Sequence, residues 1–259
     1  MAAVAENPPL PVTNENTAPT EQTEKANGDS VTVFHDADNF NVKHPLMHEW
    51  TLWFTKPPSG KASYRRDSSS TGLLIFPFQG DNWNDLLKEV VTFNSVEEFW
   101  GIYNNITPTS ELGLKADYHL FKKGIRPEWE DPQNKHGGKW SYSFKDKRSV
   151  PIDELWLHAQ LAAIGETLEN DGDSEVMGVV VNVRKGFYRV GLWTRTVGKS
   201  LPGDKAGTRT PAQGKEVLES IGRRFKEVLR LKESDVVEFS GHTDSAHSGS
   251  TRAKAKYTV

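Results

Sequence analysis

A tryptophan among three carboxylates, in Glu128-Trp129-Glu130-Asp131, is the segment of this 259-residue chain with the clearest capacity for chemistry. Carboxylate pairs beside an aromatic platform occur in glycoside-processing proteins, but such pairs need separation and different environments, which adjacent residues do not guarantee. An indole with an acid beside it also suits the binding of a flat cationic ring that donates hydrogen bonds. A glycan-binding or glycoside-processing protein is therefore kept as the alternative to a protein that only binds such a ring.

The chain contains eight tryptophans, and they do not all fit the interior of a domain. Trp50, Trp53 and Trp140 lie in apolar or alternating segments that predict core strands. Trp83 lies in Asp81-Asn82-Trp83-Asn84-Asp85, which is a polar setting for a large apolar ring. Trp83 is therefore a candidate for ligand contact.

A strongly basic stretch lies in the second half of a chain whose formal net charge is −3. Residues 184–232 contain thirteen Lys or Arg against four Asp or Glu. This asymmetry predicts a local anion-binding region, although Arg223, Arg224 and Lys226 fit the solvated face of a helix equally well. Indoles, a carboxylate and several cations together suit guanine methylated at N7, because that ring is cationic and can carry phosphates.

Composition and motifs argue against catalysis and against a membrane segment. The absence of cysteine excludes disulfides, thiol catalysis and Cys-ligated zinc, and it favours a reducing intracellular compartment. No glycine-rich phosphate loop, G-x-S-x-G elbow or H-E-x-x-H motif is present. His44 and His48 have the spacing of helical zinc ligands, but Pro45 lies between them and no third ligand is evident. We expect no enzyme activity, no metal and no cofactor.

Residue patterns predict a tail followed by an α+β domain. Residues 1–30 have no large apolar side chain beyond Leu10 and are expected to be disordered, with a single domain over residues 31–259. An interruption over about residues 55–82 has the composition of a long loop. Strands are predicted at 50–54, 139–144, 175–184, 187–196 and 236–239, and helices after Ser95, from Pro151 and over 213–231. Because strands and helices do not alternate strictly, we expect an antiparallel sheet.

Three local patterns make finer predictions. Ser95-Val96-Glu97-Glu98 predicts a capping box, in which the Ser hydroxyl and a Glu carboxylate each accept a backbone amide at the helix start. The helix from Pro151 carries two apolar stripes, the first formed by Leu155, Ala159 and Ala162 and the second by Leu157, Leu161 and Ile164. The second stripe fits either full burial or a partner. In the hairpin around Lys185-Gly186, Asn182 and Arg184 share one face, as do Arg189 and Trp193.

Several segments, taken in order, resemble the eukaryotic translation initiation factor 4E family. The similarity is carried by His44-Pro45-Leu46 with Trp50 and Trp53, and by residues 96–100, 125–131, 134–140, 181–184 and 192–194. The resemblance implies a curved antiparallel β-sheet with a cap site on its concave face and about three α-helices on its convex face. It also implies a monomer, in the cytoplasm and also in the nucleus, that binds the 7-methylguanosine 5′ cap of mRNA.

The resemblance assigns the residues around the methylated guanine. Trp83 and Trp129 would sandwich the ring, Glu130 would accept hydrogen bonds from its edge, and Trp193 would contact the N7-methyl group. The interval from Trp53 to Trp83 is longer than the family's usual loop, so the position of Trp83 depends on an unfamiliar segment.

The resemblance also assigns the phosphate contacts. Arg184 and Arg189 would hold the phosphates, with Asn182 and Lys139 in supporting positions. Many relatives have one more residue between the Arg and the following Lys-Gly, so Lys185 is included among the ligand residues without a defined role.

On the convex side, the resemblance implies a groove for a partner helix. That helix carries a Tyr-x-x-x-x-Leu-apolar motif in the scaffold factor 4G and in 4E-binding repressor proteins. The matching positions are His44, Pro45, Val96, Trp100, Leu157, Leu161 and Gly165. His158 stands where many animal relatives have an acid, so the salt bridge of those relatives is not carried over.

Overall fold

The computed structural model describes residues 31–32, 35–36, 38–57, 83–201, 209–244 and 255–259. The predicted tail and residues 58–82 of the predicted loop lie outside this part of the chain. The chain divides into two compact units, Met1–Val42 and Lys43–Val259. In the first unit, the Asp36 carboxylate accepts the amides of Asp38 and Asn39 in a turn. A single domain over residues 31–259 stays a prediction.

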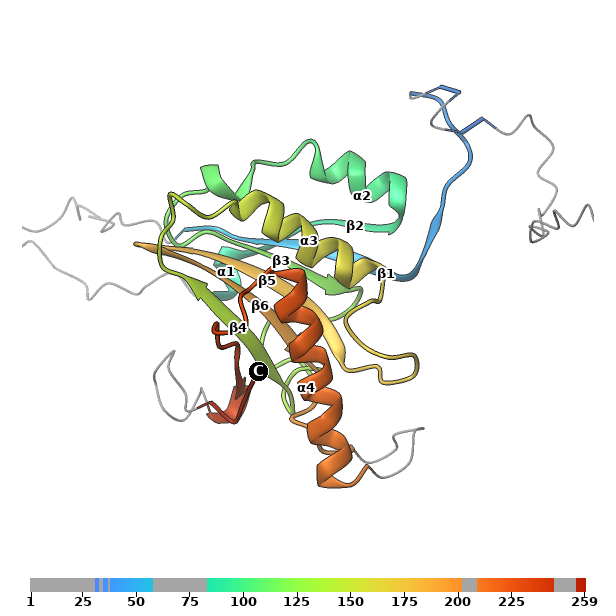
Figure 1. Cartoon of the computed structure of the whole chain (residues 1–259). Helices are drawn as coiled ribbons and strands as arrows, with labels where there is room; N and C mark the ends of the chain where they lie inside the picture. The colour runs from blue at the N-terminus through green and yellow to red at the C-terminus, as the bar shows by residue number, and fades with distance from the viewer. Residues whose placement is uncertain (1–30, 33–34, 37, 58–82, 202–208, 245–254) are drawn as a thin grey trace, which may run out of the picture. The chain divides into compact units, whose positions relative to one another are not determined.

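The described residues of the second unit form one eight-stranded sheet, ordered β2-β1-β3-β5-β6-β4-β7-β8 (Figure 1). Its strands are β1 (Pro45–Thr55), β2 (Leu87–Ser95), β3 (Asp117–Lys122), β4 (Gly138–Phe144), β5 (Val176–Arg184), β6 (Phe187–Thr194), β7 (Glu238–Gly241) and β8 (Tyr257–Thr258). All neighbouring strands pair antiparallel, which confirms the expected sheet. The sequence predicted β1, β4, β5, β6 and β7 but not β2, β3 and β8.

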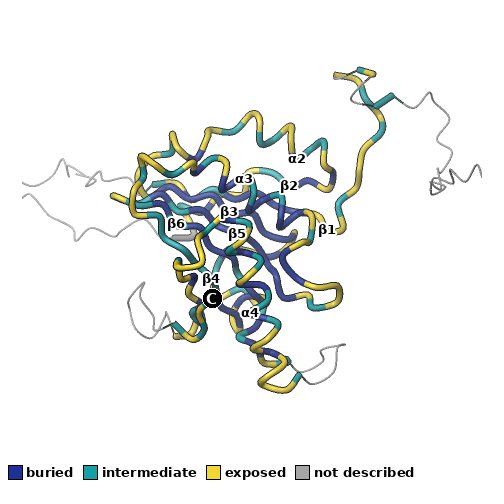
Figure 2. Tube along the Cα trace, viewed as in Figure 1, coloured by how far each residue is buried: buried dark blue, intermediate teal, exposed yellow. Residues whose placement is uncertain are grey.

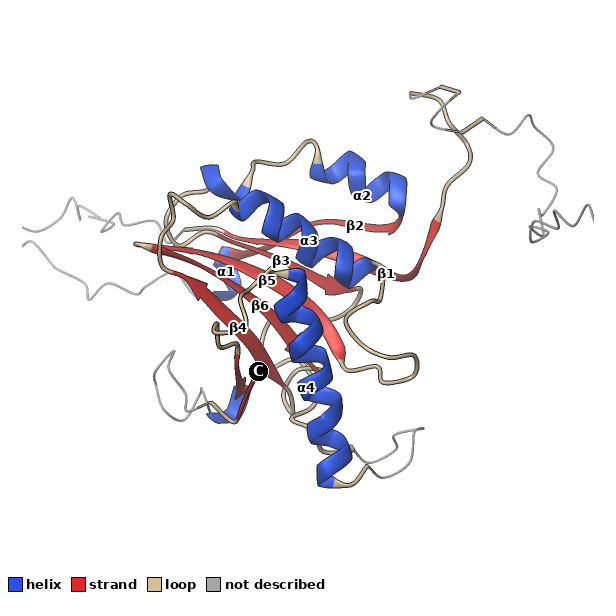
Figure 3. Ribbon diagram, viewed as in Figure 1, coloured by secondary structure: helices blue, strands red, loops and turns tan. Residues whose placement is uncertain are grey.

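Helices α2 (Val96–Tyr103), α3 (Ile152–Ile164) and α4 (Pro211–Val228) cover one face of this sheet (Figure 3). The single-turn helix α1 (Trp83–Leu86) precedes β2, and the 3-10 helix η1 (Thr109–Glu111) follows α2. This arrangement confirms the predicted α+β class, with three helices behind a curved antiparallel sheet. Across the described ranges, no helix combines the length and the apolar character needed to cross a membrane.

The starts of two helices differ in detail from the predictions. Ser95 Oγ accepts the Glu98 amide at 3.3 Å, as a capping box requires. The other half of the box is not formed, because the Glu98 carboxylate accepts the Asn94 amide at 3.0 Å and pairs with Lys43 at 2.6 Å. Pro151 occupies the N-cap of α3 and not its first turn. Both differences leave the predicted helix in place, within the usual uncertainty of a helix end.

The main apolar core lies between the sheet and these helices, where Figure 2 shows the buried strands. Its fully buried members include Trp50, Leu120, Trp140, Val181, Leu192 and Phe239 from the strands and Trp156, Ala159, Leu218, Ile221 and Phe225 from the helices. Full burial of a large apolar side chain contributes about 1.5–3 kcal/mol. The predictions that Trp50 and Trp140 belong to the core are confirmed.

A second, smaller apolar cluster lies on the other face of the sheet. It consists of Trp53, Leu87, Phe121, Ile125, Met177 and Val180, with Trp193 packed against it. Successive residues of a strand point to opposite faces, so Trp50 and Trp53, three positions apart in β1, belong to different clusters. Trp53 is 6% exposed, which confirms that it is a core residue.

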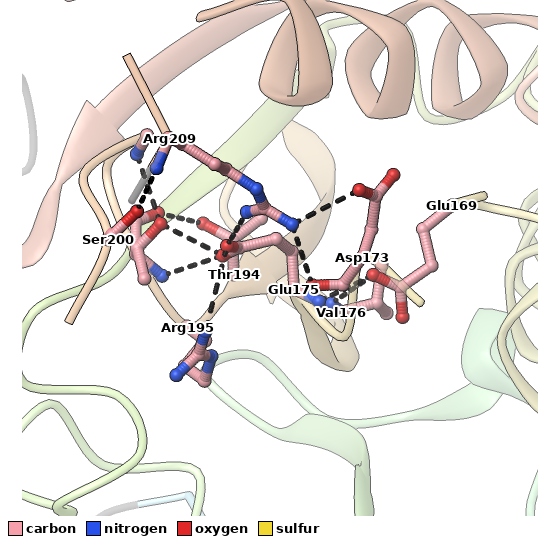
Figure 4. A network of polar contacts seen from close by, with 10 residues as sticks. Glu169, Asp173, Glu175, Val176, Thr194, Arg195, Ser200 and Arg209 are labelled. Carbon is pink, nitrogen blue, oxygen red and sulfur yellow. Dashed lines mark hydrogen bonds and ion pairs between the residues drawn. The ribbon is translucent and has the colours of Figure 1, made fainter. Parts of the chain in front are cut away.

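A buried polar network holds the segment between β6 and α4 against the start of β5 (Figure 4). Glu175 is 1% exposed and accepts the amide and the hydroxyl of Thr196, both at 3.0 Å. Arg209 donates to Glu175 at 2.6 Å and to Asp173 at 3.1 Å. Burial raises the pKa of Glu175, and the hydrogen bond from Thr196 and the charges of Arg195 and Arg209 oppose that rise. Both ends of this connecting segment are therefore anchored to the sheet.

Two helical glycines have opposite surroundings and predict opposite effects of one substitution. A Cβ at Gly222 in α4 would lie 2.7 Å from the fully buried Trp140 ring. A Cβ at Gly101 in α2 would meet nothing within 4 Å. In urea denaturation, we expect Gly222→Ala to lower the free energy of unfolding by about 1–3 kcal/mol and Gly101→Ala to raise it by about 0.5–1 kcal/mol. A stabilised Gly222→Ala variant would contradict the packing of α4 on Trp140.

Candidate functional site

The strand register places five of the predicted ligand residues on one face of the sheet. Asn182 lies opposite Arg189 across β5 and β6, and Trp193 lies opposite Lys139 across β6 and β4. Arg184 follows Asn182 at an alternate position of β5 and shares its face. The predicted facial pairs in the hairpin are confirmed. We call this face, which is opposite α2, α3 and α4, the polar face.

Arg184 is held by a carboxylate that the sequence analysis missed. Its Nη1 and Nη2 donate to Asp117 Oδ1 and Oδ2 at 2.5 and 2.9 Å. Asp117 is the first residue of β3 and its side chain is 2% exposed, whereas that of Arg184 is 34% exposed. A bidentate pair of this kind fixes the plane of the guanidinium and offsets part of its charge.

His119 lies beside this ion pair and is uncharged at neutral pH. Its Nε2 lies 2.7 Å from Thr55 Oγ1, and the residue is 3% exposed. Burial lowers the pKa of His119 to about 4, Asp117 opposes this shift and Arg184 adds to it. The imidazole therefore adds no positive charge to the polar face.

Two more cations stand close together on the polar face. Arg189 Nε donates to Ser143 Oγ at 3.0 Å. Burial lowers the pKa of Lys139, and the neighbouring charge of Arg189 lowers it further. An anion placed beside both cations would relieve this repulsion. Lys185 is exposed in the turn between β5 and β6.

Trp193 forms an aromatic wall near the other end of β6. Its ring centre lies 5.5 Å from that of Phe121 and 4.2 Å from that of His242. Burial lowers the pKa of His242 to about 3, and the charge of Lys139 contributes to this shift. A neutral imidazole leaves the electron-rich indole suited to a cationic ligand. No pattern in the sequence pointed to His242.

Trp129 is 45% exposed in a loop between β3 and β4 that is held by internal hydrogen bonds. Asn134 is fully buried, and its Nδ2 donates to the carbonyls of Arg126 and Glu128 at 2.8 and 2.9 Å. The Asp131 carboxylate accepts the Arg126 amide at 2.9 Å. The exposure of the Trp129 indole is therefore imposed by an ordered loop.

The same loop gives different roles to the three carboxylates around Trp129. Glu128 pairs with Arg126 at 2.9 Å, and Asp131 accepts backbone amides, so both brace the loop. Glu130 is exposed, and its carboxylate accepts the Trp129 indole N–H. The Arg126 guanidinium lies 5.3 Å from the centre of the Trp53 ring, which brings the loop to the polar face.

The predicted partner residues of β1 and α2 are joined by hydrogen bonds. His44 Nδ1 lies 2.6 Å from Glu97 Oε1, and the His44 carbonyl accepts the Val96 amide at 3.0 Å. Pro45 lies opposite Ser95 in the β1–β2 pairing. These contacts place His44, Pro45 and Val96 next to one another.

The remaining partner residues lie on α2 and α3. Trp100 is 36% exposed, and Leu157 and Leu161 of α3 are partly exposed. Gly165 is the C-cap of α3, and His158 Nε2 lies 3.9 Å from Glu154 Oε1.

The two helices are joined by one hydrogen bond, from the Tyr103 hydroxyl to the Asp153 carbonyl at 3.4 Å. The second apolar stripe of α3 is divided between the core and the surface. Ile164 is buried in the core, whereas Leu157 and Leu161 are partly exposed. We call the seven predicted partner residues, which lie in or directly beside β1, α2 and α3, the helix-side surface.

Trp83 and the histidine pair His44 and His48 are the remaining residues considered for ligand or metal binding. Trp83 begins α1, but its side chain lies outside the described part of the chain. His44 and His48 contact different carboxylates, those of Glu97 and Glu166. Among the residues that the structure describes, no three His, Cys, Asp or Glu are grouped to hold a metal ion.

Comparisons with known proteins agree on one family. The chain is 48% identical over 254 residues to eukaryotic translation initiation factor 4E-1 of Schizosaccharomyces pombe, covering 98% of this chain and 99% of that protein. Its fold is similar to Ascaris suum eIF4E-3 in complex with an m7G cap, with 32% identity, a TM-score of 0.63 and coverage of 84% and 98%. It is also similar to Caenorhabditis elegans eIF4E-3 in complex with the 4E-binding protein Mextli and a cap analog, with 29% identity, a TM-score of 0.61 and coverage of 84% and 100%. The sequence profile described as Eukaryotic initiation factor 4E matches residues 45–257, and this chain belongs to that family.

Proposed function

We propose that this chain binds the 7-methylguanosine cap of mRNA on its polar face and a helix of an initiation scaffold or repressor protein on its helix-side surface. The observation that carries the proposal is the row of Trp193, Lys139, Arg189 and Arg184 on one face of the sheet. An aromatic wall followed by cations matches a ligand with a cationic ring at one end and phosphates at the other. Capture of such a ligand needs no catalytic step, so the proposed role is binding without catalysis.

The methylated guanine is proposed to lie between Trp129 and Trp83, with its edge on Glu130. Stacking of a cationic ring between two indoles gains both dispersion and cation–π attraction. The Glu130 carboxylate is exposed in a braced loop, so it can accept the ring N–H groups without a large rearrangement. Trp193, backed by the neutral His242, is proposed to contact the N7-methyl group.

The phosphates are proposed to lie along Arg184, Arg189 and Lys139, with support from Asn182 and Lys185. Arg184 is already paired with Asp117, so it orients a bound phosphate more than it adds net positive charge. Arg189 and Lys139 repel each other, and a phosphate beside them removes that cost. These two cations therefore supply most of the proposed electrostatic attraction.

The helix-side surface is proposed to bind an amphipathic helix with the Tyr-x-x-x-x-Leu-apolar motif. Exposed Val96 and Trp100 with partly exposed Leu157 and Leu161 supply an apolar strip from two adjacent helices. The similar Caenorhabditis elegans protein forms a complex with the 4E-binding protein Mextli, which supports a protein partner for this chain. The absence of cysteine supports action in a reducing compartment, the cytoplasm and also the nucleus.

The first prediction of the proposed function concerns recognition of the methylated base. Trp129→Ala and Glu130→Gln should each weaken binding of methylated GTP by about ten to a hundredfold, because stacking contributes about 1–3 kcal/mol and a charged hydrogen bond about 1.5–3 kcal/mol. Calorimetric titration with methylated and unmethylated GTP measures both effects. Wild-type protein that binds the two nucleotides equally would refute the proposed function.

The second prediction separates the contribution of the phosphates to affinity from that of the methylated base. Arg189→Ala should reduce the slope of log affinity against log salt by about 0.7–0.9 for each phosphate that is no longer neutralised, with the preference for methylated GTP retained. Arg184→Ala is a poorer test, because it leaves the buried Asp117 unpaired and should destabilise the fold by about 3–5 kcal/mol. An unchanged salt slope in Arg189→Ala would remove Arg189 from the phosphate site.

The third prediction tests the independence of the two surfaces. Trp100→Ala should cost about 2 kcal/mol or more in affinity for a peptide with the Tyr-x-x-x-x-Leu-apolar motif, because aromatic anchors dominate such interfaces. Its affinity for methylated GTP should stay within about twofold of wild type. Trp129→Ala is the matched control and should show the reverse pattern. Loss of both activities in folded Trp100→Ala would contradict the assignment.

A further inference from the structure

Phe187 is an aromatic residue that the packing of the domain does not account for. It is the first residue of β6, lies opposite Arg184 across the hairpin and is partly exposed. Neither of the two apolar clusters formed by the described residues includes Phe187, although the next residue, Tyr188, belongs to the main core. A large ring kept at the surface beside a proposed ligand site suggests contact with that ligand.

Cations surround Phe187 on the polar face. The Arg189 guanidinium lies 5.3 Å from the centre of the Phe187 ring, and Lys185 is exposed in the turn that precedes it. Arg184, which lies opposite Phe187, is oriented by its pair with Asp117. An aromatic ring among cations is the combination that single-stranded nucleic acid recognises, since bases stack on the ring and phosphates meet the charges.

A second basic segment lies beside the same hairpin. The residues that follow β4 are Lys145-Asp146-Lys147-Arg148, in which Lys145 and Arg148 are exposed. Lys147 Nζ lies 4.3 Å from the centre of the Tyr188 ring, so this segment adjoins the β5–β6 hairpin (Figure 1). Tyr188 faces the helices, so Lys147 lies on that side of the sheet. Ser143 pairs with Arg189 on the polar face and Lys145 comes two positions after Ser143, so Lys145 continues the positive charge of the polar face toward the end of the sheet.

We propose that Phe187, with Lys185 and Lys145, binds the first nucleotides of the RNA that follow the cap. The inference rests on the proposed function, because it assumes that methylguanine lies at Trp193 and the phosphates at Arg189. Trp193 and Phe187 are separated along β6 by about 20 Å at 3.3 Å per residue, which leaves room for a nucleoside and its phosphate bridge. The RNA chain that leaves this bridge then reaches Phe187 with a base and Lys185 and Lys145 with phosphates.

The ring of Phe187 selects RNA over other polyanions. Cations alone would attract an acidic peptide as well, but a peptide gains little from a ring that already contacts Arg189. A base can stack on the aromatic and guanidinium surface whatever its sequence, because every base has a π-face. The proposed subsite is therefore expected to strengthen binding to capped RNA without sequence preference.

The experiment compares two ligands on the full-length chain. These are methylated GTP and a capped five-nucleotide RNA, each titrated against wild type, Phe187→Ala and Phe187→Tyr. Phe187→Ala should weaken binding of the capped RNA by about tenfold and binding of methylated GTP by less than about twofold, whereas Phe187→Tyr should keep both affinities. Equal losses for the two ligands, or no loss for either, would overturn the proposal.

Lysine variants test the phosphate contacts. Lys145→Ala should reduce the salt slope for capped RNA by about 0.7 for each phosphate that is no longer neutralised and should leave the slope for methylated GTP unchanged, whereas Lys185→Ala should affect both ligands, because Lys185 is also proposed to support the cap phosphates. Lys199→Ala is the matched control, because Lys199 is exposed beyond the opposite end of β6. An equal change in Lys199→Ala would overturn the assignment of these lysines. Wild type that fails to bind methylated GTP would refute the cap proposal itself. Normal binding of methylated GTP, together with an unchanged affinity of Phe187→Ala for capped RNA, would refute the subsite alone.

Discussion

Burial of one face of the sheet under α2, α3 and α4 is the interaction on which the rest of the structure depends. Each large side chain sealed there contributes about 1.5–3 kcal/mol, more than a typical net hydrogen bond of about 1 kcal/mol. Trp140 and Leu192 face the helices, so their neighbours Lys139 and Trp193 must face the other way. A slip of one residue would turn every side chain over, so the core that fixes the register also fixes the polar face.

The polar face then carries a fixed pattern of charge. Across β3 and β5, the Arg184 guanidinium is balanced by the buried Asp117 carboxylate. Farther across the sheet, Arg189 and Lys139 repel each other. Burial holds the pKa of His119 at about 4 and that of His242 at about 3, so neither imidazole changes charge between about pH 5 and 8. These two histidines therefore add no pH-dependent charge to the polar face in that range, and attraction for an anion comes from arginine and lysine.

The sequence predicted those strands and helices whose spacing of apolar residues matches the period of the element they form. The alternation in 139–144 predicted β4, and Lys185-Gly186 between two apolar runs predicted the β5–β6 hairpin with its facial pairs. By contrast, all six residues of β3 are buried, so this strand has no alternation for a periodicity argument to detect. The capping box at Ser95 was only half correct because Lys43 and the Asn94 amide compete for the Glu98 carboxylate.

Residues that act through contacts distant in sequence were the ones missed in the site. Asp117 is one acid at the start of an aromatic-rich segment, and nothing local indicates that it meets Arg184 across β3 and β5. His242 follows the four-residue strand β7, and its contact with Trp193 exists only once β7 has paired with β4. The ligand-facing residues had a chemical signature in sequence, whereas those that orient them depend on strand order.

The two proposed surfaces lie on opposite sides of one packed sheet, and this separation has a mechanistic consequence. Transmission between distant sites requires an element with two alternative arrangements that both ligands bias. Between Trp100 and Trp193, the described chain consists of paired strands and a core in which Trp50, Trp140 and Trp156 are buried. Close packing of this kind resists a second arrangement. A capped RNA and a partner helix can then occupy the molecule together without competing, which is what a bridge between messenger RNA and protein requires.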